Sequence, residues 1–261
     1  MLKTILFIFI SMFNAAFFNK IVVTNKLIKI PSYLFSLILI IVSLPMITHP
    51  SSLIILTTII LLIATYNEII QFNNKNKKTT ILKSGFFIGL MTTIDLNFWI
   101  FYLLILFGLF YYQEFNWRNF VIQLLGLILP LIFYYNLKLL DFEFINLMYT
   151  QHYSTKPSLN ILDEYPVFLS LLSILLILSG KELYNNYYKK TEHAKKGFII
   201  ILIIIPIVIV NIILYQKLQF GYLLALPITM LIGNYLIYVK QVYFRTFLLG
   251  LLFVSFLFDI F

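Results

Sequence analysis

Long apolar stretches with almost no charge constrain this chain more than any other feature of its sequence. Charged residues make up 11% of the 261 residues, whereas soluble domains carry about 25%. The charges are bunched into short polar runs, and the stretches between them approach the ~20 apolar residues that a membrane helix needs. The pattern predicts an all-α, polytopic transmembrane helical bundle. It excludes a soluble enzyme, a disordered chain and a nucleic-acid-binding protein.

Ten apolar segments follow one another along the chain, some of them short or kinked by proline. They are 2–18, 31–48, 51–70, 84–94, 98–112, 117–137, 166–180, 198–215, 220–239 and 242–260. Fusing the two segments around Asp95 would give nine. We expect them to form one integral membrane domain over residues 1–261, with a long outer loop at 138–165.

The distribution of basic residues favours ten spans over nine, because cytoplasmic loops are enriched in Lys and Arg. With ten spans and the N-terminus outside, nearly all of the 19 basic residues face the cytoplasm. The exceptions are Lys3, Lys138, Lys156 and Lys217. With nine spans, the basic run at 189–196 would face outwards. We therefore predict a cytoplasmic (inner) membrane protein with loops 19–30, 71–83 and 181–197 in the cytoplasm.

A cleaved signal peptide is the alternative interpretation of the first segment. Lys3 followed by an apolar run has the order of charge and hydrophobicity found in such peptides. The following stretch, FNAAFF, is a poor cleavage site, and cleavage would leave Lys20, Lys26 and Lys29 outside.

The sequence also limits the chemistry that the chain can perform. It has no cysteine, which excludes disulfides, thiolate metal sites and cysteine nucleophiles. Its three histidines, His49, His152 and His193, are far apart, and no zinc-protease or phosphate-loop motif is present. We therefore expect neither a metal nor a cofactor.

Polar groups on the outer side are the candidates for chemistry, because a carboxylate near a membrane is costly unless it is paired or hydrated. His49 and Asp95 both lie in very short outer turns, and we expect them to converge on one cavity mouth as catalytic residues. The long outer loop supplies Asp141, Glu143 and His152 as expected substrate-binding residues. The alternative for all five is the ordinary polarity of a loop.

Two spacings predict structure rather than chemistry. Gly85 and Gly89 form a GxxxG pattern, which lets two helices approach closely. We expect it to pack against another helix of this chain, with a dimer interface as the alternative. Glu114 and Arg118 are four residues apart, a spacing that favours an ion pair.

About half of the chain, residues 14–140, resembles an uncharacterised family of multi-pass inner-membrane proteins of Bacteroidota. The similar stretches are HPSSLIILTTIILLIATYNEI, KKTTILKSGFFIGLMTTIDLNFWIFYLLILFGLF and, most specifically, FNWRNFVIQLLGLILP. In that family a similar F-[NR]-W-R-E-W run leads into a G-x-x-x-P helix. Here Asn119 and Phe120 replace the Glu-Trp pair. The resemblance implies a membrane protein and no particular activity.

A weaker resemblance is to integral-membrane glycosyltransferases that use polyprenyl-phosphate sugars. It consists of a polar outer turn, an apolar helix, a basic inner loop and a short G-x-x-x-G helix. Those enzymes carry a catalytic acid in their first outer loop, but the matching connection here is predicted inside and has no acid. His49 falls roughly where a second acid is expected. If the chain is catalytic, we expect Asp95 to be the base or metal ligand and His49 to be its partner.

Three functions follow as hypotheses. The first is assistance to envelope glycan or lipid-carrier biogenesis on a glycosyltransferase-like scaffold, and the second is a non-enzymatic membrane subunit or scaffold. The third is a small-solute transporter, which ranks last because no span carries a central charge and no internal repeat is evident. The expected partners are the lipid bilayer and either other membrane proteins or a polyprenyl-linked lipid, with no nucleic acid.

Overall fold

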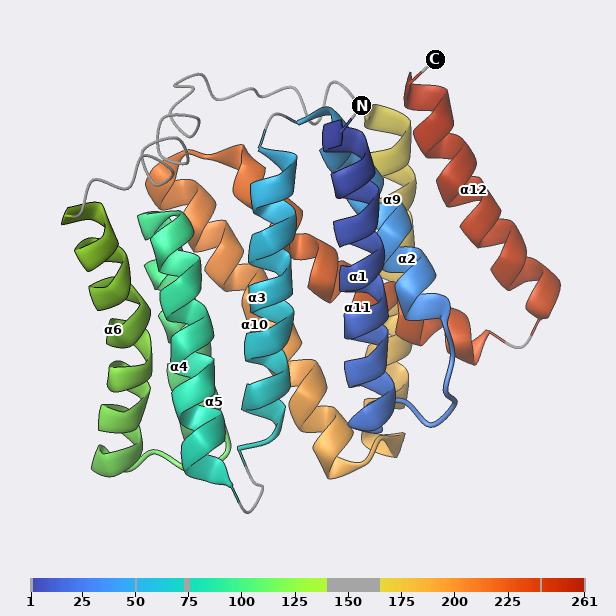
Figure 1. Ribbon diagram of the computed structural model, residues 1–261. Helices are drawn as coiled ribbons and strands as arrows, with labels where there is room; N and C mark the ends of the chain where they lie inside the picture. The colour runs from blue at the N-terminus through green and yellow to red at the C-terminus, as the bar shows by residue number, and fades with distance from the viewer. Residues whose placement is uncertain (1, 50, 73–75, 140–164, 240, 261) are drawn as a thin grey trace. The chain divides into compact units, whose positions relative to one another are not determined.

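Helices form all the regular structure in the described part of the chain, which comprises residues 2–49, 51–72, 76–139, 165–239 and 241–260 of a computed structural model (Figure 1). The α-helices are α1 (Leu2–Thr24), α2 (Leu34–Ser43), α3 (Ser52–Ile70), α4 (Lys77–Ile94), α5 (Tyr102–Tyr111), α6 (Trp117–Leu139), α9 (Pro166–Asn186), α10 (Glu192–Tyr215), α11 (Ala225–Tyr238) and α12 (Val242–Ile260). The 3-10 helices are η1 (Leu44–Thr48), η2 (Leu96–Phe101), η3 (Tyr187–Lys189) and η4 (Leu218–Leu224). The predicted all-α class is confirmed for these residues.

Six of the described helices are long and apolar enough to cross a membrane. They are Lys3–Thr24, Ser52–Ile70, Trp117–Leu139, Pro166–Lys189, Glu192–Tyr215 and Gln219–Tyr238. Each of the ten expected segments corresponds to one of the 10 α-helices of the described residues. The break at Asp95 is present, since this residue is extended between α4 and η2. That all ten segments span a membrane stays a prediction.

Several helices extend further into polar sequence than the apolar segments suggested. α4 begins at Lys77 rather than at residue 84, and α10 begins at Glu192 rather than at residue 198. Lysine can occupy the end of an apolar helix because its long side chain carries the charge to water. Hydrophobicity alone therefore underestimates the length of these helices.

The chain divides into two compact units. Unit 1 comprises Met1–Leu56, Ser158–Leu202 and Gly221–Phe261, and unit 2 comprises Thr57–Pro157 and Ile203–Phe220. Within the described residues, the boundaries between them fall within α3, α10 and η4. The expected single membrane domain over residues 1–261 stays a prediction.

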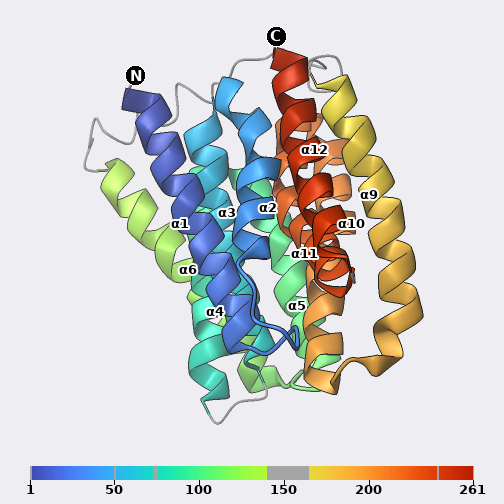
Figure 2. The ribbon, with the colours of Figure 1, turned by 90° about the vertical axis from the view of Figure 1, so that its right-hand side faces the viewer.

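In unit 1, α11 is the central helix, and most of its side chains between Ala225 and Ile237 are buried. It packs against α2 and α9, while α9 also packs against α12 and α2 against α1 (Figure 2). The contact with α2 is close at Gly233, where a Cβ atom would collide with the ring of Phe35. Unit 1 is therefore held together by apolar helix–helix contacts.

The end of α12 caps the beginning of α9 in unit 1. The Asp259 carboxylate accepts hydrogen bonds from the backbone N–H groups of Val167, at 3.2 Å, and Phe168, at 2.8 Å. The first N–H groups of a helix have no partner inside the helix, and the helix dipole favours an anion there. This contact places the C-terminal end of α12 beside the N-terminal end of α9.

In unit 2, α4 and α6 lie side by side, and glycines bring their backbones together (Figure 1). A Cβ atom on Gly85 would collide with the backbone carbonyl of Gln123. A Cβ atom on Gly89 would lie 2.9 Å from the Pro130 ring. The expectation that the GxxxG spacing packs inside the chain is confirmed. The same face is therefore not free for a dimer interface.

We predict that Gly85→Ala destabilises the protein, because the added methyl group meets a backbone atom that cannot rotate away. Overpacking of this kind costs about 1–3 kcal/mol. Gly180→Ala in α9 is the matched control, since no described atom outside the backbone of its own helix lies within 4 Å of its Cβ position. Helix propensity alone should make that variant more stable by about 0.5–1 kcal/mol. Unfolding of the purified protein in detergent measures both, and equal stability of the two variants would contradict the close α4–α6 packing.

Candidate functional site

His49 lies between η1 and α3, in the turn where the sequence placed it. Its ring Nδ1 lies 2.7 Å from Ser51 Oγ, and its carbonyl accepts a hydrogen bond from Lys3 Nζ at 3.1 Å. The ring meets the edge of Tyr222 with centroids 5.9 Å apart. Burial lowers the pKa of His49, and the charge of Lys3 lowers it further. The imidazole is therefore neutral at pH 7, and these contacts all lie within unit 1.

A second polar contact lies beside the first in sequence and joins the end of η1 to α9. Thr48 Oγ1 and the Tyr165 hydroxyl are 3.2 Å apart. The Tyr165 ring stacks on Phe256 of α12, with centroids 5.7 Å apart. The His49 turn therefore lies at the end of unit 1 where α1 and α9 begin and α12 ends.

Asp95 uses both of its carboxylate oxygens within unit 2. Oδ1 accepts the backbone N–H of Asn97 at 3.0 Å, and this bond caps η2. Oδ2 accepts from Lys217 Nζ at 3.0 Å. The Asp95 side chain is 11% exposed and that of Lys217 is 26% exposed, so solvent screens this ion pair only weakly. The ion pair therefore joins the break between α4 and η2 to the short segment between α10 and η4.

Two further contacts join α10 to η2 beside this ion pair. Asn211 Nδ2 donates to the Asn97 carbonyl at 3.1 Å, and Trp99 Nε1 donates to the Tyr215 hydroxyl at 2.8 Å. The buried Oδ1 of Asn211 has no hydrogen-bond partner among the described residues. This end of unit 2 is therefore a polar cluster in which Asn211 Oδ1 has no partner among the described residues.

Sequence reasoning missed Lys217 as the partner of Asp95. Both residues were assigned to the outer side, where charges are few, and that scarcity was the one indication of a pair. The two positions are 122 residues apart, and no spacing rule connects residues so distant.

The expected site residues fall in different parts of the chain. His49 belongs to unit 1 and Asp95 to unit 2, so their convergence and their catalytic roles stay predictions. The expected substrate-binding residues Asp141, Glu143 and His152 lie outside the described residues. Within the described residues, no three His, Asp or Glu side chains form a group that could hold a metal ion.

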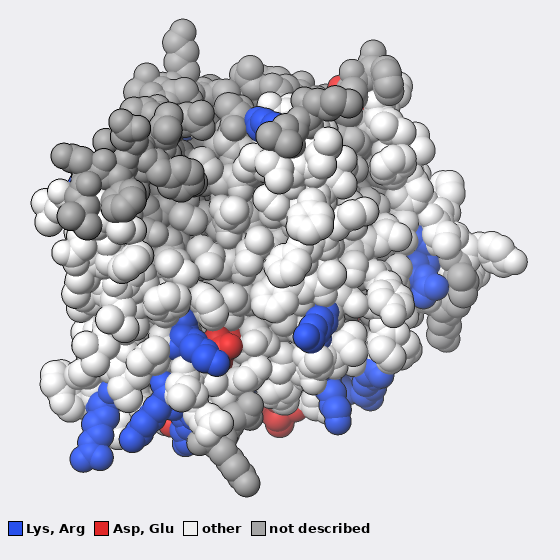
Figure 3. Space-filling view, viewed as in Figure 1, with Lys and Arg blue, Asp and Glu red and all other residues white. Residues whose placement is uncertain are grey.

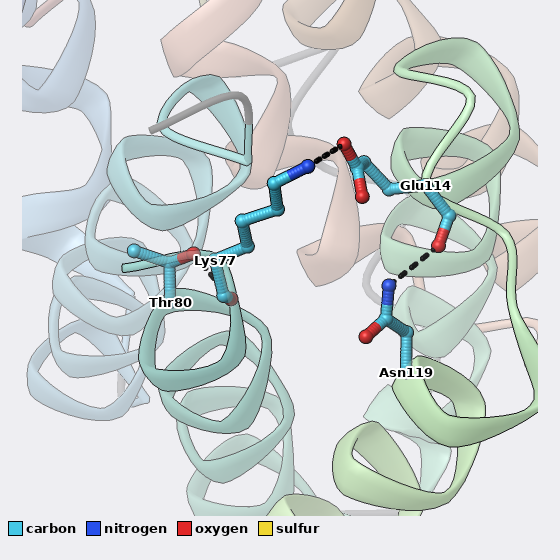
Figure 4. Close-up of polar contacts among 4 residues, drawn as sticks. All are labelled: Lys77, Thr80, Glu114 and Asn119. Atoms are coloured by element: carbon cyan, nitrogen blue, oxygen red, sulfur yellow. Dashed lines mark hydrogen bonds and ion pairs between the residues drawn. The ribbon is translucent and has the colours of Figure 1, made fainter. Parts of the chain in front are cut away.

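Glu114 pairs with a different residue from the one that its spacing suggested. Its Oε1 lies 2.6 Å from Lys77 Nζ at the start of α4, and its carbonyl accepts from Asn119 Nδ2 at 2.8 Å (Figure 4). The expected pair with Arg118 does not form, because α6 begins at Trp117 and Glu114 precedes it. Residues four apart face each other only when both belong to one helix.

Basic side chains gather at this end of unit 2. In Figure 3, Lys and Arg side chains cluster over the region where α4 and α6 begin. The exposed residues there are Lys77, Lys78, Lys83 and Arg118. The opposite ends of these two helices carry Asp95 and Lys138. The beginnings of α4 and α6 are therefore more basic than the opposite ends of these two helices.

We predict that Asp95 and Lys217 are energetically coupled. Asp95→Asn and Lys217→Gln should each destabilise the protein by about 1–3 kcal/mol, since each leaves a shielded charge without its partner. The double variant should lose less than the sum of the single losses.

The matched control for this cycle is Glu192 and Lys195, whose oxygen and nitrogen lie 2.8 Å apart with Glu192 81% exposed. Exposed pairs contribute about 0–1 kcal/mol, so their coupling should be small. Denaturant unfolding in detergent measures both cycles. Additive losses for Asp95 and Lys217 would show that the ion pair does not stabilise the fold.

Comparison with known proteins identifies a family but no activity. No curated protein and no solved structure matches this chain. A family model described as a family of unknown function, DUF6427, matches residues 1–261. This match extends well beyond the expected resemblance over residues 14–140. The match carries no information on Bacteroidota or on glycosyltransferases, so those resemblances stay predictions. Because the matched region covers residues 1–261, the chain belongs to the DUF6427 family of unknown function.

Proposed function

We propose that this chain is a multi-pass protein of the cytoplasmic membrane that acts as a non-enzymatic subunit or scaffold. The observation that supports this function best is that the two expected catalytic residues make hydrogen bonds within the chain. Both oxygens of Asp95 accept hydrogen bonds within the chain, and the His49 ring is hydrogen-bonded to Ser51. A general base needs a lone pair directed at its substrate, whereas one lone pair on each Asp95 oxygen and the Nδ1 side of the His49 ring are directed at the protein.

The membrane placement rests on helix length and on charge. Six apolar helices of sufficient length support a membrane protein, and cytoplasmic loops attract basic residues. We propose that the N-terminus lies outside and that loops 19–30, 71–83 and 181–197 lie in the cytoplasm. The basic residues at the start of α4 and α6 would then meet the anionic inner leaflet.

One observation favours a second function, assistance to envelope glycan or lipid-carrier biogenesis. The helix break at Asp95 lies beside the unused Oδ1 of the buried Asn211. Non-helical backbone at membrane depth is tolerated where it is buried in protein or lines a cavity. A buried acceptor that has no partner among the described residues would suit a hydroxyl group of a polyprenyl-linked glycan.

Genetic complementation separates the two functions. In cells lacking the gene, Asp95→Asn and His49→Ala should each restore the wild-type phenotype wherever the variant reaches wild-type protein level, because a scaffold needs neither group for chemistry. Immunoblotting of the membrane fraction controls for protein level. Gly180→Ala is the control variant, because its added methyl group meets no other helix. Loss of function at normal protein level would overturn the scaffold and favour the second function.

Reporter fusions test the orientation. Alkaline phosphatase folds into its active form only outside the cytoplasm, so a fusion after Lys156 should be active and one after Lys190 inactive. Lys156 lies in the predicted outer loop, outside the described residues. The reverse pattern would contradict the orientation, and equal activity at both positions would contradict the ten-span topology.

A further inference from the structure

The basic patch at the start of α4 and α6 contains two charges without an acid beside them. The patch consists of Lys77, Lys78, Lys83 and Arg118, which are all exposed (Figure 3). Lys77 Nζ lies 2.6 Å from Glu114 Oε1, and the charge of Lys83 acts on Glu68 of α3. Within the described residues, no carboxylate lies within 4.0 Å of Lys78 or Arg118. The charges of these two groups are therefore left to an anion from outside those residues.

The close packing of α4 on α6 places these two groups at the same end of unit 2. A Cβ atom on Gly85 would meet Gln123, and one turn further along α4 a Cβ atom on Gly89 would meet Pro130. The two helices therefore run in the same direction and begin at the same end, as Figure 1 shows. The two basic residues without an acid are the second residues of these helices.

The helix ends themselves add to the positive potential of the patch. The N-terminal end of a helix carries a partial positive charge, which an acidic residue balances and a basic residue reinforces. Neither α4 nor α6 has an acidic residue in its first turn. Asn76, which precedes α4, makes no side-chain hydrogen bond to the end of that helix. An anion beside Lys78 and Arg118 would balance the charge of both helix ends.

The patch continues along α6 into an exposed apolar face. Leu125, Leu129 and Ile132 follow Arg118 by seven, eleven and fourteen residues, so all four side chains lie on one face of the helix. The three apolar side chains are exposed, and Trp117 beside Arg118 is 73% exposed. Among the six long apolar helices, α6 is the least buried. A ligand that matches this face has an anionic group at one end and long apolar chains behind it.

We propose that Lys78 and Arg118 bind the phosphate group of an anionic phospholipid whose acyl chains lie along the exposed apolar face of α6. The guanidinium group of Arg118 presents paired N–H donors to phosphate oxygens, and the ammonium group of Lys78 supplies a further charge. Free phosphate would match these charges but not the apolar face. A phospholipid matches both, because its charge and its chains have the same order as the side chains of α6.

The lipid partner rests on the proposed placement of the chain in a membrane. The site itself lies within unit 2 and does not depend on which end of the helices faces the cytoplasm. The reporter fusions that test the orientation can therefore fail while the lipid site holds, and the lipid site can fail while the orientation holds.

The two tryptophans of the chain provide local reporters for the test. Trp117 adjoins Arg118, whereas Trp99 lies in η2, beyond the other end of α4. The whole chain is reconstituted into bilayers of phosphatidylcholine and phosphatidylglycerol, with one of the two lipids brominated near its headgroup. Bromine quenches the fluorescence of a tryptophan that the lipid contacts. Trp99→Phe isolates the emission of Trp117, and wild type minus Trp117→Phe gives the same emission if Trp99→Phe does not fold.

Phosphatidylglycerol should quench Trp117 with a binding constant about 25-fold above that of phosphatidylcholine, because each of the two basic residues contributes about fivefold in affinity. At Trp99 the two lipids should differ by less than about twofold, since the lipid site lies beyond the other end of α4. Lys78→Gln and Arg118→Gln should each lower the preference at Trp117 about fivefold. Lys181→Gln, which removes the same charge from an exposed position in α9, should leave that preference unchanged.

The same titrations contain the results that would overturn the site. Equal quenching of Trp117 by both lipids would overturn it and leave the membrane placement standing, whereas no quenching by either lipid would overturn both. An equal effect of Lys181→Gln and Arg118→Gln would show diffuse attraction. Displacement of phosphatidylglycerol by inorganic phosphate or by a polyglutamate peptide, at constant ionic strength, would assign the patch to a soluble anion and overturn the lipid site.

Discussion

An apolar helical chain can shield a charge from water only where a partner meets it, and this constraint operates at helix ends in both units. In unit 2, Asp95 pairs with Lys217 at one end of α4, and Lys77 pairs with Glu114 at the other. In unit 1, Asp259 serves as the cap of α9. Burying a charge without a partner costs far more than pairing it. Each of these contacts therefore also fixes which helix ends lie together.

Between the ends, the helices are held by shape. Gly85 and Gly126 let α4 and α6 approach until their backbones touch, and Gly233 admits the Phe35 ring against α11. Such contacts need small residues because apolar helices in lipid gain little from hydrophobicity alone. The polar contacts at the helix ends determine which helices lie together, and the glycines allow those helices to pack closely.

Sequence patterns predicted much of this fold because its governing rule is local. Apolar stretches of helical length, the break at Asp95 and the internal role of Gly85 and Gly89 are all present. The helix ends were harder to predict. α5 ends at Tyr111, two residues before Gln113, which has a positive φ of 59°. Glycine is the usual residue in this conformation after a helix, so no sequence rule marks a helix end at glutamine.

The candidate site depended on contacts that local rules do not contain. The sequence placed His49 and Asp95 correctly in turns, because each interrupts an apolar run. It did not reveal that Ser51 and Lys217 contact them. Only three-dimensional placement supplies such partners.

Membrane insertion of the apolar helices is the central claim, and a single-cysteine measurement tests it directly. The chain has no cysteine, so one introduced thiol is the only thiol. Ile177 in α9 is 72% exposed in the folded chain, and lipid would cover it. We predict that Ile177→Cys does not react with a membrane-impermeant maleimide in broken native membranes until SDS is added. Lys189→Cys, beyond the end of the same helix, should react without SDS. Reaction of Ile177→Cys in native membranes at the rate of Lys189→Cys would contradict insertion.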